Sequence, residues 1–79
     1  MINNFIAKSE DNKLLPVQVC LELTEDISER EIRGVVEACH WLGVSKGMIL
    51  TFDEENELSV EGINIRVLPV WKWCIEAFV

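Results

Sequence analysis

The chain has 79 residues, which gives room for one domain with one hydrophobic core and excludes a two-domain protein. Hydrophobic residues make up 49% of the chain and charged residues 27%, so the composition excludes an intrinsically disordered segment. The formal net charge is −7, and an acidic surface disfavours binding to nucleic acids, whose recognition usually depends on clustered Lys and Arg. A local basic patch stays open as an exception.

The three cysteines lie far apart in the sequence and in apolar surroundings, at Cys20, Cys39 and Cys74. This pattern favours small buried side chains in a reducing cytosol over disulfides, and the absence of a CxxC or Cys/His pair gives no metal site. The amino terminus lacks the pattern of a secretion signal, and no apolar run approaches the roughly 20 residues that span a bilayer. We therefore predict a soluble cytoplasmic protein with no cofactor, no metal and no membrane association.

The first part of the chain predicts two antiparallel strands. Residues 2–8 are β-prone, and the polar residues 9–12 have the composition of a chain reversal. The second strand covers about residues 15–23, and its two-residue alternation places four aliphatic residues on one face, namely Val17, Val19, Leu21 and Leu23. The other face carries Gln18, Cys20 and Glu22.

A helix is predicted over about residues 27–42. Its buried stripe has helical spacing and consists of Ile32, Val35, Val36, Cys39 and Leu42. A Ser or Asp followed three positions later by an acidic residue, as at Ser28 and Glu31, is typical of a helix start. Gly43 is placed to end the helix in a left-handed turn.

The same helix has a second surface beside this stripe, formed by Gly34, Ala38 and Trp41. A glycine inside a helix costs about 1 kcal/mol relative to alanine, which favours close approach of another element at Gly34. Trp41 then either covers an edge of the core, which is the interpretation we favour, or belongs to a groove for a partner.

The second half of the chain predicts a strand over residues 46–52, a hairpin and a closing helix. The strand should lie parallel to the strand before the first helix, because that helix serves as a crossover. The next two strands alternate around Glu61 and Gly62, a pair suited to a two-residue turn. Pro69 ends the last strand and can open a helix. We expect Trp73 to point away from the docking stripe of this helix, which consists of Trp71, Cys74, Ile75 and Phe78.

The predicted order of elements is ββαβββα over a single domain, residues 1–79, and its class is α/β (α+β) with helices on a mixed sheet. Five segments in this order carry a resemblance to a known family: VQVCLEL, SEREIRGV, GMILTFDEE, ELSVEGINIRVLPVW and WKW. Together they resemble the carboxy-terminal region of a group of predicted archaeal and bacterial AAA-type ATPases, over nearly the whole chain. That region is similar to the PD-(D/E)XK fold, so the resemblance implies a restriction-endonuclease-like core in degenerate form.

The resemblance also implies where the catalytic residues of that fold would stand. The family pattern has an Asp on one strand and a Glu-x-Lys on the next, which together hold Mg²⁺ and a water molecule. Those positions are occupied here by Asn4, Gln18 and Cys20. Two amides remove the anionic charge that the ion needs and a thiol supplies no fixed positive charge, so metal-dependent hydrolysis is disfavoured. Glu22 is the candidate for a displaced ligand, although one carboxylate makes a poor magnesium site.

No GxxxxGK[ST] phosphate loop occurs, so the chain is either the carboxy-terminal domain of a longer ATPase or a free-standing protein. The leading hypothesis is a non-catalytic accessory or interaction domain that binds an AAA-type ATPase module in cis or in trans, with Trp73 and Trp41 as interface candidates. For Trp73, a ring folded over an edge of the core is an equal alternative. A nuclease-like domain that binds DNA or cleaves it with Mg²⁺, and a small homodimer paired through a sheet edge, are the alternative functions.

Overall fold

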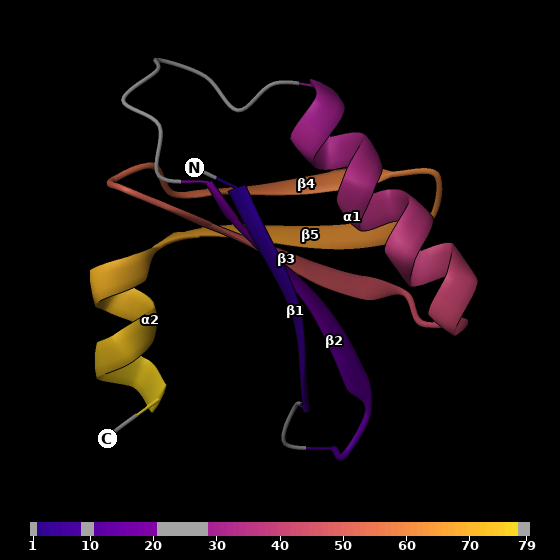
Figure 1. Cartoon of the computed structure of the whole chain (residues 1–79), viewed down its shortest axis with the longest axis horizontal. Helices are drawn as coiled ribbons and strands as arrows, with labels where there is room; N and C mark the ends of the chain where they lie inside the picture. Colours follow the sequence, from indigo (N-terminus) through magenta and orange to yellow (C-terminus); the bar gives the residue numbers. More distant parts are fainter. Residues whose placement is uncertain (1, 9–10, 21–28, 78–79) are drawn as a thin grey trace.

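The computed structural model describes residues 2–8, 11–20 and 29–77, with the backbone alone at residues 2–4 and 77. The elements follow in the order β1, β2, α1, β3, β4, β5 and α2, as predicted, and the strands form one mixed sheet in the order β1-β2-β3-β5-β4 (Figure 1). The chain is therefore a small α+β domain with a five-stranded sheet and two helices. The restriction-endonuclease-like identity of this core stays a prediction.

The antiparallel pair predicted at the amino-terminal end is confirmed. Strand β1 (Ile2–Lys8) pairs with β2 (Leu14–Cys20), and the Cα partners include Asn4 with Gln18 and Phe5 with Val17. Directly opposed residues of an antiparallel pair point to the same face, so the Asn4 and Gln18 positions share one face and Phe5 and Val17 share the other. The continuation of the second strand to Leu23 lies outside the described residues.

The crossover helix is also confirmed. Helix α1 (Glu29–Leu42) connects β2 to β3 (Lys46–Thr51), and β3 lies parallel to both β2 and β5. Gly43 ends the helix with a φ of 71°, and the next amide, of Val44, donates a 3.0 Å hydrogen bond to the Cys39 carbonyl. This is the left-handed helix end that the glycine predicted, because a residue without Cβ enters that conformation at no steric cost.

The hairpin of the second half is the third confirmed element. Strand β4 (Asn56–Val60) pairs antiparallel with β5 (Ile63–Pro69) around a two-residue turn. Both turn residues have positive φ, 51° at Glu61 and 80° at Gly62, as the turns that match the twist of a hairpin require. The Arg33 guanidinium pairs with the Glu61 carboxylate and joins this turn to α1.

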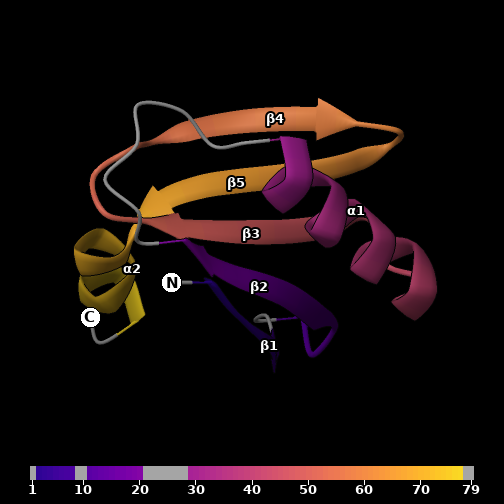
Figure 2. The same ribbon diagram turned by 45° about the horizontal axis from the view of Figure 1, so that its top comes forward.

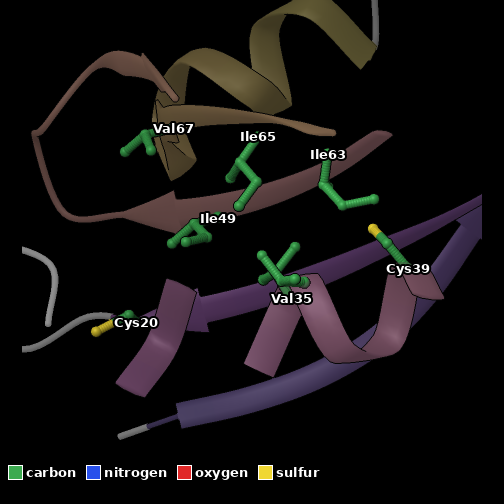
Figure 3. Packing of buried hydrophobic residues seen from close by; sticks show 8 residues of the cluster. Cys20, Val35, Cys39, Ile49, Ile63, Ile65 and Val67 are labelled. Carbon is green, nitrogen blue, oxygen red and sulfur yellow. The ribbon is translucent and has the colours of Figure 1, made fainter. Parts of the chain in front are cut away.

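One face of the sheet packs against α1 and forms the main core. Val35 of α1 points toward Ile49 and Ile65 of the central strands, and Cys39 points toward Ile63 (Figure 3). The buried residues of this cluster are Cys20, Val35, Val36, Cys39, Ile49, Ile63, Ile65 and Val67. The predicted helix stripe is therefore correct, with Ile32 packed at its margin and Leu42 half-buried.

The opposite face carries a smaller cluster, which α2 (Val70–Ala77) covers at the end of the sheet where β5 finishes (Figure 2). Val17, Met48, Leu50 and Leu68 form the buried part of this cluster.

Val70 and Trp73 of α2 pack against this smaller cluster, and the Trp73 ring lies 6.3 Å from the Phe5 ring, centroid to centroid. Two exposed ion pairs, Arg66 with Glu76 and Lys72 with Glu55, join α2 to β5 and to the loop before β4.

The predicted docking stripe of α2 is wrong. Trp71 is 57% exposed, Ile75 is 56% exposed and Cys74 is also exposed, so these residues face outward, whereas Trp73 faces the sheet. Helical spacing shows which residues share a side, but the side that docks depends on where the helix leaves the sheet. Here α2 begins directly after Pro69, and Val70 and Trp73, three positions apart, meet the cluster first. Phe78 lies outside the described residues.

Candidate functional site

The positions that the resemblance assigns to a catalytic centre lie on the α1 face of the sheet. Gln18 and Cys20 alternate with Val17 and Val19, which pack on the other face. Both Gln18 and Cys20 are 7% exposed, and Cys20 is a member of the main core cluster. The structure thus places these two residues on the predicted common face, and the pairing of β1 with β2 brings the Asn4 backbone opposite Gln18. Glu22 lies outside the described residues.

Gln18 lies against α1 at Gly34. A Cβ atom built on Gly34 would lie 2.9 Å from Gln18 Oε1, so the absence of a side chain at this position lets the amide fit between strand and helix. Close approach at Gly34 is therefore confirmed. The element that approaches is β2, through its one long polar side chain on this face.

An open groove of about 420 Å³ runs along the same junction of strand and helix. Its lining residues come from the β1–β2 hairpin and from α1, and they are Phe5, Ile6, Pro16, Val17, Gln18, Gly34, Val35 and Ala38. Phe5 and Val17 border the groove with their backbone, because their side chains lie on the opposite face of the sheet. Gln18 is the sole polar side chain among these lining residues, and none of them is ionisable. The groove is therefore suited to an apolar group that carries one hydrogen-bonding atom.

The chemistry of this face differs from that of a magnesium site. Its lining offers an amide and no carboxylate, whereas Mg²⁺ requires hard anionic oxygen ligands. Across the part of the chain that the structure describes, no three His, Cys, Asp or Glu side chains lie close enough to hold a metal ion. Glu31, in the first turns of α1, is a buried acidic residue at 5% exposure that the sequence interpretation assigned only to capping.

The two tryptophans proposed as interface candidates have different surroundings. Trp41 is 85% exposed, so the interpretation that it covers an edge of the core is wrong. Trp73 is half-buried against the smaller cluster and its ring contacts Phe5, which matches the alternative of a ring over a core edge. Trp71 has the exposed position that was expected of Trp73, and the sequence pattern missed it.

The three thiols differ in accessibility, since Cys20 and Cys39 are buried and Cys74 is exposed. Burial raises the pKa of the Cys39 thiol, which also donates a hydrogen bond to the Lys46 carbonyl at 3.3 Å. In the native protein we expect a thiol reagent at neutral pH to modify Cys74 rapidly and Cys39 only when the chain unfolds, because the thiolate is the reactive form. Peptide mapping after timed alkylation, with a urea-unfolded sample as control, measures this order.

The raised pKa also predicts a loss of stability in alkali. Below the ordinary pKa of a thiol, about 8.5, Cys39 is neutral in both folded and unfolded chains and does not change the free energy of unfolding. Above it the unfolded chain releases the proton more readily than the folded one, so stability falls as pH rises. A Cys39→Ala variant should lose this part of the decrease in the free energy of unfolding at alkaline pH. In the alkylation experiment, equally fast modification of Cys39 and Cys74 in the native protein would contradict the argument that Cys39 is buried.

Among the described residues, neither helix has the length and apolar composition needed to cross a bilayer. Comparison of the chain with protein-family models, with curated protein sequences and with solved structures gave no significant match.

Proposed function

We propose that this chain is a non-catalytic interaction domain that binds a partner protein through the outward face of α2. The observation that carries the proposal is the exposed side of this helix, where Trp71 and Ile75 lie four positions apart and Cys74 lies between them in sequence. Large apolar side chains with this spacing form a continuous strip, and tryptophan is enriched among residues that dominate binding energy.

The charges beside this strip support an apolar contact. Lys72 and Glu76 of α2 are engaged within the chain, with Glu55 at 2.8 Å and with Arg66 at 3.0 Å respectively. Their pairing leaves the apolar strip bordered by neutralised groups, so a partner would not have to desolvate a lone charge there. Phe52 adds a further exposed ring at the same end of the sheet, because the preceding Thr51 pairs with Pro69, from which α2 starts.

The face that would carry nuclease chemistry supports the non-catalytic part of the proposal. Neither Gln18 nor Cys20 carries a carboxylate, both are buried, and Cys20 is part of the core. The resemblance to the carboxy-terminal region of AAA-type ATPases suggests the partner, an ATPase module in cis or in trans. The domain would then contribute binding and positioning while the ATPase supplies the chemistry.

Trp71→Ala is expected to weaken binding to the proposed partner, an AAA-type ATPase module, by about thirtyfold or more, the usual effect at a dominant contact residue. Its effect on stability should stay within about 0.5 kcal/mol, because the ring is largely exposed. Isothermal titration calorimetry measures the affinity, and thermal unfolding followed by circular dichroism measures the stability.

Trp73→Ala is the matched control, because it removes the same kind of ring two positions further along α2, from a site where the ring is packed against the sheet. It should lower stability, and it should change binding only as far as it unfolds the domain. Unchanged affinity in Trp71→Ala would exclude the α2 surface. Manganese-dependent DNA cleavage that disappears in Gln18→Ala would instead return the nuclease alternative to first place.

A further inference from the structure

The groove between α1 and the β1–β2 hairpin contains a buried polar side chain, Gln18, that has no hydrogen-bond partner among the described residues. Gln18 is more than nine-tenths buried, and its side-chain amide forms no hydrogen bond with any described residue. Among the described residues, every side-chain nitrogen or oxygen that is completely shielded from solvent has a hydrogen-bond partner. The unpaired amide of Gln18 therefore retains some contact with solvent, and the groove that it lines is the adjacent opening. Because buried polar groups usually have hydrogen-bond partners, this amide is available to bind a ligand that carries a complementary donor or acceptor.

The apolar surface around the groove continues beyond its walls. Gly34, Ala38 and Trp41 share one side of α1, since steps of four and three residues return to the same side of a helix. On the sheet, Ile6 is 53% exposed and Leu14 is exposed as well, and both lie on the α1 face by the pairing register. Helix α1 packs on β2, β3 and β5, which leaves β1 at the margin of its cover.

This surface contains a protrusion and a hollow side by side. The protrusion is Trp41, 85% exposed and absent from the lining of the groove, so it does not fill the hollow of its own chain. The hollow is the groove at Gly34 and Ala38, two residues with almost no side-chain volume. Trp41 and Gly34 are seven residues apart, which is about 10 Å along a helix. The groove, at about 420 Å³, has room for on the order of ten water molecules and so for one indole side chain.

We propose that a second copy of this chain binds here, with the Trp41 indole of each copy inserted into the groove of the other and its Nε1–H donating a hydrogen bond to Gln18 Oε1. A two-fold axis between the protrusion and the hollow makes both contacts at once, as in an isologous dimer. The indole is largely apolar with one N–H donor, which is the combination that this groove offers to bind. The inference goes beyond the α2 surface and does not depend on it.

The charge of the chain predicts how this dimer responds to salt. Each copy carries a net charge of −7, and no residue lining the groove is ionisable, so the long-range force between copies is repulsive. Screening therefore strengthens the dimer as the ionic strength rises through the physiological range, where the Debye length is about 8 Å. A cationic partner in the same groove would give the opposite dependence.

Sedimentation equilibrium of the full chain over a range of concentrations tests the proposal. We expect a reversible monomer–dimer equilibrium that tightens with added NaCl. Because the dimer contains each contact twice, Trp41→Ala should weaken it by about a thousandfold, as for two dominant interface residues, and Gln18→Leu by about thirtyfold, for two lost hydrogen bonds. Trp71→Ala should leave it unchanged, which separates this interface from the α2 surface.

A complementation experiment tests the reciprocal geometry. Trp41→Ala removes the protrusion and keeps the groove, whereas Ala38→Leu fills the groove and keeps the protrusion. Each variant alone should be monomeric, and an equimolar mixture should form heterodimers, because one of the two indole contacts is restored. A wild-type chain that stays monomeric, a Trp41→Ala variant that dimerises normally, open-ended assembly, or a mixture that does not associate would each overturn the proposal. Both substituted positions lie outside the buried core, and circular dichroism verifies that each variant is folded.

Discussion

Replacing Ile49 with alanine is expected to lower the free energy of unfolding by about 2–5 kcal/mol, the range for truncating a buried isoleucine. Ile49 is fully buried on β3, the central strand, where it packs between α1 and the neighbouring strands (Figure 3). A domain of 79 residues has a free energy of unfolding of roughly 4–12 kcal/mol in total, so this single change removes a large part of it. Urea unfolding followed by far-ultraviolet circular dichroism measures the loss.

Ile75→Ala is the control for this experiment. The same side chain is truncated, but Ile75 is 56% exposed on the outer side of α2, so the change in stability should stay within about 0.5 kcal/mol. Equal losses in the two variants would mean that the outer side of α2 is packed in solution, which would also contradict the proposed binding surface.

Replacing Gly47 with alanine is expected to destabilise the domain by about 1–3 kcal/mol, the usual cost of forcing extra volume into a packed core. In an open strand position the same change would stabilise, because glycine costs roughly 0.5–1 kcal/mol relative to alanine. The sign is decided by space: a Cβ on Gly47 would collide with Val35 Cγ1 and would lie 3.1 Å from Cys39 Sγ. Gly47 is thus the position at which α1 approaches β3 most closely through a missing side chain.

A double-mutant cycle with Val35→Ala distinguishes this collision from other causes. Val35→Ala alone leaves a cavity and should destabilise. In the double variant the new methyl group occupies part of the space that Val35 vacates, so the combined loss should be smaller than the sum of the two single losses. Strict additivity would show that Gly47 is required for a backbone reason and that the steric explanation is wrong.

Much of the fold was predictable because it follows from local properties of the sequence, and no tertiary contact changes what those properties favour. The stripe of α1, the left-handed end at Gly43 and the positive φ of Gly62 follow from helical spacing and from the conformational freedom of glycine. The alternation of Gln18 and Cys20 against Val17 and Val19 likewise needs only the two-residue period of a strand.

The candidate sites were predictable only in part. Gln18 was identified from its place on the strand, but the groove beside it needs the α1 approach at Gly34 and the pairing of β1, which are contacts between distant parts of the chain. Trp71 and Trp73 stand two positions apart in the sequence, on either side of Lys72. Which of the two rings faces the cluster depends on the direction in which α2 leaves β5.

By itself, the sequence determined the order of the elements and which residues of each share a side, because hydrophobic periodicity and turn chemistry are local properties of the chain. Only the tertiary structure decided which of those sides is covered. Trp41 and Trp71 are exposed because one helix per sheet face leaves the margin at β1 and the outer side of α2 without a neighbour among the described residues. Burial is a property of the assembled layers, and for that reason spacing alone could not assign it.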